Sequence, residues 1–386
     1  MTRGVAILGS TGSIGTSTLQ VLRRQRERFR VVALTAHSNA ELLEGQVAEW
    51  HPAYVGIVNG GGILKYSLMV VGRGAWEGGT GNACLVEAAT HPDVGIVVNA
   101  IVGAAGLEAT LAALRAGKRV ALANKEALVM AGELVTEAAR AGGGEIVPVD
   151  SEHSAVLQCI TGRRPGELAR LILTASGGPF RTWTPERLAG ATVAEALQHP
   201  TWKMGKKITV DSATLVNKAL EVIEAHFLFG LPYPAVQVVV HPQSVVHAFV
   251  EFVDGSVLAQ VGFPTMELPI LYALTHPERV PDRGAKRFDP VEAGALTFEP
   301  VRPELYPAYA LGRAAGEQGG TAPAAFNAAN EVAVQLFLEG RIRFGKIAET
   351  IERVLAAPWP SSARSLEDVL SADAVARRLA REAACS

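Results

Sequence analysis

The feature that most constrains the fold is a short apolar run that leads directly into a glycine turn near the N-terminus. Val5–Leu8 has the composition of a buried strand, residues 9–15 read Gly-Ser-Thr-Gly-Ser-Ile-Gly, and Thr16–Arg24 has a helical pattern. Strand, glycine turn and helix in this order are typical of a dinucleotide-binding unit, in which backbone N–H groups approach a pyrophosphate. The Gly-x-x-Gly-x-x-Gly spacing is a variant, and glycine turns also occur simply to fit a tight βα corner.

Strand and helix patterns alternate from this unit up to residue 149. Strand patterns recur at 30–34, 53–58, 66–71, 94–98, 119–122 and 145–149, and helix patterns at 40–50, 82–89, 107–116 and 127–140. This order predicts an α/β fold with a doubly wound, Rossmann-like parallel sheet, whose ligands bind at the carboxyl ends of the strands.

The end of the second strand bears on the choice of cofactor. Dinucleotide sites for NAD usually place an acidic residue there to bind the ribose 2′-hydroxyl, but this chain reads His37-Ser38-Asn39. The missing acid favours NADP over NAD and makes these three residues candidates for binding the 2′-phosphate. Alternatively, Ser38 or Asn39 caps the helix predicted at 40–50.

Two carboxylates follow the strand predicted over Glu145–Val149. In extended chain, residues two apart point to the same side, so Asp150 and Glu152 are predicted to converge, with Ser151 and His153 beside them. Hard anionic oxygens suit Mg²⁺ or Mn²⁺ better than zinc. The alternative is a solvated turn after a strand, which is the usual explanation of an isolated Asp-x-Glu.

Asn124, Lys125 and Glu126 follow another strand and are expected at the same edge of the sheet. Glu126 can alternatively stabilise the first turn of a helix, and Lys125 can be a solvated loop residue.

Further polar residues accompany a helix predicted to begin at Asp211 or Ser212 and to end near Phe229. Most of its circumference is apolar, which indicates burial, so its one polar arc, formed by Asn217, Lys218, Glu221 and Glu224, is expected to line a site. On this arc Glu221 is a candidate third carboxylate for the metal. Ser212, Asn217 and Lys218 are candidates for binding phosphate. The turn Ser176-Gly-Gly can form an anion-binding nest, or it can be an ordinary turn.

The segment before that helix, His199–Gly205, mixes His, Trp, Met, Pro and Gly without periodicity. Such a segment can act as a mobile lid that excludes water from a ligand. Alternatively, it is an ordinary loop whose Trp202 and Met204 pack into the core.

The rest of the chain predicts an α+β region followed by helices. A strand at 236–240 and a hairpin over 248–261 are expected to leave a sheet edge that a second copy can pair with. Residues 264–303 resemble a partly ordered connector, and helices are predicted at 308–317, 324–339, 346–356 and from 366 or 372 to 384. Asn327 and Asn330 are expected at the surface or at a domain contact.

Composition excludes several classes of protein. The chain has 386 residues, a net charge of −2 and no long charge run, which argues against nucleic acid or an anionic membrane as a partner. No stretch has the roughly 18 apolar residues of a membrane span, and no signal peptide is recognisable. The three cysteines form no plausible disulfide framework, so a cytoplasmic setting is expected.

Seven motifs, in chain order, resemble the 1-deoxy-D-xylulose 5-phosphate reductoisomerase family. The resemblance runs through the whole chain and is carried by residues 9–15, 123–126, 148–153, 176–180, 199–205, 211–221 and 241–244. It implies an N-terminal Rossmann-like domain (1–149), a central α+β catalytic, metal-binding and dimerisation domain (150–275), a connector (276–303) and a C-terminal helical domain (304–386).

The resemblance also implies an activity. Such a protein is an NADPH-dependent homodimer that requires Mg²⁺ or Mn²⁺, with Co²⁺ as a third candidate, in the non-mevalonate isoprenoid pathway. Its substrate is a phosphorylated sugar, 1-deoxy-D-xylulose 5-phosphate, and its product is 2-C-methyl-D-erythritol 4-phosphate.

Residue roles carry over by motif. The implied metal ligands are Asp150, Glu152 and Glu221, which with Lys125 and His199 form the catalytic set. The implied substrate contacts are Lys125, Ser151, Glu152, Ser176, His199, Trp202, Met204, Ser212, Asn217, Lys218 and Glu221. The implied NADPH contacts are Thr11, Gly12, Ser13, Ile14, Asn124, Glu126 and Gly205. Relatives often read Gly-Lys-Asn where this chain has His37-Ser38-Asn39, so a narrower preference for NADP is expected.

Two rival hypotheses fit less well. An aspartate-semialdehyde-type dehydrogenase needs an activated cysteine, whereas Cys84 and Cys159 both fall in apolar helical patterns. A nucleotide-sensing protein without turnover would not need the complete carboxylate and lysine sets.

Overall fold

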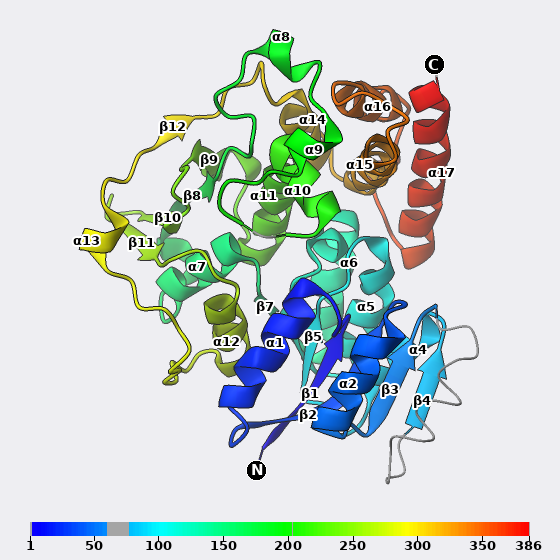
Figure 1. Ribbon diagram of the computed structural model, residues 1–386, viewed down its shortest axis with the longest axis vertical. Coiled ribbons are helices and arrows are strands. Elements are labelled where there is room, and N and C mark those ends of the chain that lie inside the picture. The colour runs from blue at the N-terminus through cyan, green and yellow to red at the C-terminus, as the bar shows by residue number, and fades with distance from the viewer. Residues whose placement is uncertain (1, 60–76, 203, 386) are drawn as a thin grey trace. The chain divides into compact units, whose positions relative to one another are not determined.

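The computed structural model describes residues 2–59, 77–202 and 204–385, and these form two compact units (Figure 1). The strand predicted over 66–71 lies outside the described residues. The first unit comprises Met1–Ala127, Val135–Ser154 and Thr265–Lys286, and the second comprises Leu128–Leu134, Ala155–Pro264 and Arg287–Ser386. The four functional domains expected from the sequence stay a prediction.

The first unit is built on a seven-stranded parallel sheet in the order β4-β3-β2-β1-β5-β6-β7. Its strands are β1 (Arg3–Leu8), β2 (Phe29–Ala36), β3 (Tyr54–Ile57), β4 (Glu77–Thr80), β5 (Ile96–Asn99), β6 (Arg119–Leu122) and β7 (Glu145–Pro148). The chain moves outward from β1 to one edge and then returns to β5 on the other side of β1. This reversal places the switch point, where doubly wound sheets bind ligands, at the carboxyl end of β1. The predicted α/β class is confirmed.

Among the described residues, helices follow most of these strands. They are α1 (Ser13–Arg24), α2 (Ala40–Trp50), α4 (Ala83–Thr90), the 3₁₀ turn η1 (Ala104–Gly106), α5 (Leu107–Arg115) and α6 (Lys125–Gly142). A later helix, α12 (Glu267–Thr275), packs against α1, β6 and β7. It lies in the stretch expected to be a loosely ordered connector. Residues Pro269–Thr275 are all buried, so the sequence there shows no amphipathic period from which a helix could be predicted.

The second unit contains a mixed five-stranded sheet in the order β11-β10-β8-β9-β12. The strands are β8 (Leu168–Ala175), β9 (Val236–Val240), β10 (Val246–Phe252), β11 (Val257–Val261) and β12 (Glu299–Pro300). The predicted hairpin is confirmed, because β10 pairs with β11 in antiparallel register. The other elements before residue 300 are α7 (Ser151–Ile160), which begins in the first unit, η2 (Pro165–Glu167), α8 (Pro185–Leu188), α9 (Val193–Ala196), α10 (Lys206–Ala213), α11 (Val216–Phe229), η3 (Tyr233–Ala235) and α13 (Pro290–Ala293).

The predicted helical tail is confirmed as α14 (Pro307–Gln318), α15 (Ala322–Leu338), α16 (Lys346–Leu355) and α17 (Leu366–Cys385). Helices α15, α16 and α17 pack side by side around a core shared with α10 and α11 (Figure 1). Asn327 and Asn330 of α15 are both fully buried in this core, so the surface alternative was wrong. Asn330 donates a 2.8 Å hydrogen bond to Asp211 of α10, in agreement with the alternative of a contact with the expected catalytic domain. Among the described residues, no helix combines the length and apolar composition that crossing a membrane requires.

Candidate active site

The glycine turn after β1 has the geometry that anion binding requires. The backbone N–H groups of Gly9 and Ser10 donate to the carbonyl of Thr35, at 3.1 and 2.8 Å, and Gly9 has a φ of +82° that favours glycine. Helix α1 begins at Ser13, three residues earlier than predicted. The free N–H groups of its first turn therefore lie at Ser13 and Ile14, immediately after Thr11 and Gly12.

The turn after β2 is open to solvent. His37, Ser38 and Asn39 are exposed, and the side chain of Asn39 accepts a 3.2 Å hydrogen bond from the N–H of Leu42. The expected helix cap is thus confirmed for Asn39. Binding of a 2′-phosphate by this turn stays a prediction, and the exposed Ser38 is the residue best placed to test it.

The segment after β6 is buried rather than solvated. Asn124 donates to the carbonyls of Ile101 and Gly103, both at 2.9 Å, and is fully buried. Helix α6 begins at Lys125, and the side chains of Lys125 and Glu126 are also buried. The alternative of a solvated loop lysine is therefore wrong. The carbonyl Oδ1 of Asn124 is buried without a hydrogen-bond partner among the described residues, so an acceptor is available at this edge.

The carboxylates after β7 do not lie on extended chain. The strand ends at Pro148 and α7 begins at Ser151, so Glu152 lies in the first turn of a helix and the predicted extended chain is wrong. The predicted convergence is confirmed, because carboxylate oxygens of Asp150 and Glu152 lie within 4.8 Å of each other. Asp150 accepts a 2.8 Å hydrogen bond from the N–H of Ser151 and forms an ion pair with Lys125. The hydroxyl of Ser151 donates to Glu152 at 2.5 Å. Both acids are half-buried, which argues against a solvated turn.

In the second unit, the hydroxyl groups of two predicted serines lie beside the ring of one predicted histidine. Nε2 of His199 lies 2.9 Å from Oγ of Ser176 and 3.1 Å from Oγ of Ser212. The Ser176 hydroxyl also accepts from the N–H of Gly178 at 3.1 Å. Gly178 has a φ of +64°, and a Cβ there would lie 2.6 Å from the carbonyl oxygen of Ser212, so only glycine permits this close approach. The expected nest and the expected phosphate residue Ser212 are thus parts of one cluster.

The environment of His199 determines its tautomer and charge. Nδ1 accepts the backbone N–H groups of Thr201 and Trp202, at 3.1 and 2.9 Å. In the neutral ring the proton is therefore on Nε2, from which it can be donated to a serine hydroxyl. Burial lowers the pKa of His199 to about 4, so the ring is neutral near pH 7.

The predicted single helix after this loop is two helices. Asp211 and Ser212 lie in α10 and do not cap α11, because Leu215 adopts a left-handed φ of +59° between the two helices. Helix α11 carries the predicted polar arc. Its buried Glu221 accepts hydrogen bonds from the side chains of Asn217 and Lys218.

The segment predicted to be a lid precedes α10. Trp202 and Met204 are half-buried, Gly205 is the N-cap of α10, and the ring of Trp202 lies 6.3 Å from that of His247. Lys203 lies outside the described residues. Closure of this segment over a ligand stays a prediction.

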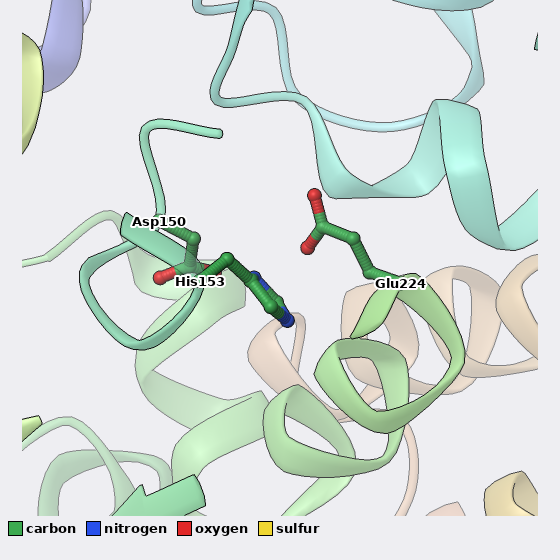
Figure 2. A group of neighbouring side chains, drawn as sticks. All are labelled: Asp150, His153 and Glu224. Carbon is green, nitrogen blue, oxygen red and sulfur yellow. The ribbon is translucent and has the colours of Figure 1, made fainter. Parts of the chain in front are cut away.

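Two further buried side chains were expected near the site from the sequence, His153 beside the carboxylates and Glu224 on the polar arc, but neither was assigned a role. His153 lies in the first turn of α7, close to Asp150, and Glu224 lies on α11 one turn after Glu221; both are fully buried (Figure 2). Burial of an ionisable group is a signal of function, but only the structure shows that these two are buried.

Comparisons with known proteins identify the family of the chain. Sequence models described as 1-deoxy-D-xylulose 5-phosphate reductoisomerase, its C-terminal domain, and DXP reductoisomerase C-terminal domain match residues 5–132, 146–229 and 261–379. A reductoisomerase of Symbiobacterium thermophilum is 50% identical over 390 residues and covers 99% of each chain. One from a Synechococcus species is 50% identical over 380 residues, covering 97% of this chain and 96% of its own.

Solved structures show the same similarity. The reductoisomerase of Zymomonas mobilis in complex with NADPH has a TM-score of 0.92 at 42% identity, with all of both chains covered. A DOX-P reductoisomerase in complex with NADPH, fosmidomycin and magnesium has a TM-score of 0.93 at 40% identity, covering 99% of this chain and 98% of its own. The chain therefore belongs to the 1-deoxy-D-xylulose 5-phosphate reductoisomerase family.

Proposed function

We propose that this protein rearranges 1-deoxy-D-xylulose 5-phosphate and reduces the resulting aldehyde with NADPH to give 2-C-methyl-D-erythritol 4-phosphate. The observation that carries the proposal is the placement of three features on one edge of the parallel sheet. The glycine turn follows β1, Lys125 follows β6, and Asp150 with Glu152 follows β7. A dinucleotide site and a hard-cation site on the same edge fit a reduction that depends on a divalent metal.

The metal site is proposed to use Asp150 and Glu152 of the first unit and Glu221 of the second. All three offer carboxylate oxygens, the donors that Mg²⁺ and Mn²⁺ prefer, and Co²⁺ can use the same set. A divalent ion bound there supplies Lewis-acid polarisation of the substrate carbonyl and lowers the pKa of its neighbouring hydroxyl. Lys125, which forms an ion pair with Asp150, is proposed to contact the substrate oxygens at the same point.

The cofactor is proposed to bind along the glycine turn, with its pyrophosphate at the start of α1. The free N–H groups there fit an anion, and the unpartnered Oδ1 of Asn124 fits a donor such as an amide. Bound NADPH supplies the hydride that reduces the aldehyde. Thr11, Gly12, Ser13, Ile14, Glu126 and Gly205 are the remaining proposed contacts, and His37, Ser38 and Asn39 are proposed to face the 2′-phosphate.

The phosphate of the substrate is proposed to bind where Ser176 and Ser212 meet His199. Two hydroxyls and a neutral ring with its proton on Nε2 offer three donors, and Asn217 and Lys218 of α11 are proposed to add an amide and a charge. Phosphate held far from the reacting carbons can orient the substrate and drive closure of Trp202 and Met204 over it.

A homodimer is proposed through the exposed edge of the second sheet. Strand β11 ends the sheet order and exposes Val257 (48%) and Leu258 (39%), which a second copy of the strand can cover. A cytoplasmic setting is also proposed, and the free thiols of Cys84 and Cys385 agree with it. NADPH oxidation on addition of 1-deoxy-D-xylulose 5-phosphate, with and without a chelator, tests the proposed function.

A further inference from the structure

A buried carboxylate in α10 connects two other side chains. The side chain of Asp211 is only 1% exposed. One of its oxygens lies 2.9 Å from the ammonium of Lys207, one turn earlier in the same helix. The other accepts a 2.8 Å hydrogen bond from the side-chain amide of Asn330 in α15. One acidic group thus connects the first turn of α10 with the core of the C-terminal helices.

This contact is not the arrangement that packing alone would favour. Asn330 is fully buried in a helix whose other buried residues are mostly alanine, valine and phenylalanine. Its amide donates to Asp211, while its Oδ1 is buried with no hydrogen-bond partner among the described residues. Burying an unsatisfied carbonyl costs free energy, and an apolar residue would fill the same space without that cost. The hydrogen bond to Asp211 is therefore what distinguishes Asn330 from an apolar residue of the same size.

The position of Asp211 in the chain suggests a role for this hydrogen bond. The next residue is Ser212, whose hydroxyl lies 3.1 Å from Nε2 of His199. Adjacent side chains on a helix point about 100° apart, so Asp211 can face α15 while Ser212 faces the histidine. Helix α10 has only eight residues, and a left-handed Leu215 separates it from α11. A fixed contact at Asp211 therefore sets the rotation of this short helix, and with it the position of the Ser212 hydroxyl.

We infer that Asp211 and Asn330 are positioning residues for the phosphate end of the substrate. They hold α10 so that Ser212 stays within hydrogen-bond distance of His199 and the phosphate meets a preformed set of donors. This inference deepens the proposed function and rests on it for the identity of the substrate. The ligand class of the site itself, a phosphate monoester, can be examined separately with inorganic phosphate.

The test compares two asparagines of the same helix. Asn327 is also fully buried, one turn before Asn330, and its Oδ1 likewise has no partner among the described residues, but its amide donates to Glu331 at 3.0 Å and not to α10. Asn327→Ala is therefore a matched control for Asn330→Ala. For both variants and the parent, we would measure phosphate affinity by calorimetry, KM and kcat by steady-state kinetics, and stability by thermal unfolding.

We expect both variants to lose similar thermal stability, while only Asn330→Ala weakens phosphate binding and raises KM, each by about tenfold. Its kcat should stay within about twofold, and its affinity for NADPH should be unchanged. Equal effects of the two variants on phosphate binding, or no effect of Asn330→Ala, would overturn the inference, as would a parent that does not bind phosphate. If the parent binds phosphate but does not turn the substrate over, the proposed function fails, and the phosphate comparison still decides the positioning role.

A second variant provides a test even if Asn330→Ala does not fold. Asp211→Asn removes the charge but preserves the shape of the side chain, and it should also raise KM more than it lowers kcat. Nitrogen NMR of His199 then reports whether its Nε2 hydrogen bond has changed. An unchanged His199 signal together with an unchanged KM in Asp211→Asn would contradict the inference.

Discussion

The ammonium of Lys125 forms an ion pair with the carboxylate of Asp150 across the carboxyl ends of two neighbouring strands of the parallel sheet. Asp150 thus has a cationic neighbour at the point where the metal is proposed to bind. The lysine and a bound metal would compete electrostatically for the same carboxylate. Metal affinity measured after replacing each residue in turn can therefore distinguish their roles.

Replacing either partner should give opposite results for metal binding. Asp150→Asn removes a ligand charge, so the Kd for Mn²⁺ should rise at least tenfold and turnover should fall by about 10³-fold. Lys125→Met removes the competing cation, so Mn²⁺ should bind as tightly as in the parent or more tightly, while kcat falls by about 10²-fold. Calorimetric Mn²⁺ titration beside kinetics checks both. Weaker Mn²⁺ binding in Lys125→Met would contradict the assignment.

The turn after β2 should control the choice of cofactor. Ser38→Asp places a negative charge where the 2′-phosphate is proposed to lie, so the ratio of kcat/KM for NADPH over NADH should fall at least tenfold. Ser38→Lys should raise the same ratio. Ser38→Ala serves as the neutral control and should change the ratio by less than about threefold. If Ser38→Asp and Ser38→Ala give the same ratio, the turn does not face the phosphate.

Stability should depend on pH through His199. Burial lowers its pKa from the usual 6.5 to about 4, so the unfolded chain binds more protons between these values than the folded protein does. The contribution is fully present above pH 6.5 and is lost as the pH falls toward 4. After allowance for solvent screening, the loss should be about 1–2 kcal/mol. Urea unfolding should show that, between pH 7 and pH 4, the parent loses that much more free energy of unfolding than His199→Gln does. If the free energy of unfolding falls equally in the two proteins over this pH range, His199 is not a buried neutral histidine.

The local patterns of the sequence predicted much of the fold. The strand, glycine turn and helix after Val5 are set by short-range composition, and α2 begins and ends at the predicted residues, Ala40 and Trp50. Other helix boundaries depend on tertiary structure and could not be predicted from these patterns. The chain turns into α7 directly after Asp150, and Leu215 breaks a helix although leucine is a good helix former.

The site was predicted only in part, because sequence patterns are local whereas the site depends on tertiary contacts. The residue pattern indicated the turn at Ser176 and the polar Ser212, and the family resemblance implied a role for His199; the structure brings these three together. Asn330 could not be assigned from the sequence, because its partner Asp211 lies 119 positions away. A buried polar pair of this kind becomes visible only when the packing of two helices is known.

The dimer should depend on the edge strand β11. A lysine in place of Val257 or Leu258 would leave a charge within the proposed contact, so either variant should shift the protein toward a monomer. Light scattering coupled to size exclusion measures the mass directly. Val253→Lys, at an exposed position beyond the end of β10, is a control and should leave the assembly unchanged. A parent that elutes as a monomer would refute the proposed dimer.

The most direct test of the proposed function is NADPH oxidation by the purified protein with 1-deoxy-D-xylulose 5-phosphate, followed at 340 nm with identification of the product. With Mg²⁺ or Mn²⁺ present, we predict one equivalent of NADPH oxidised per substrate and formation of 2-C-methyl-D-erythritol 4-phosphate. Excess EDTA should abolish the reaction, and added metal should restore it. Full activity in chelator, or no oxidation with substrate and either metal, would contradict the account.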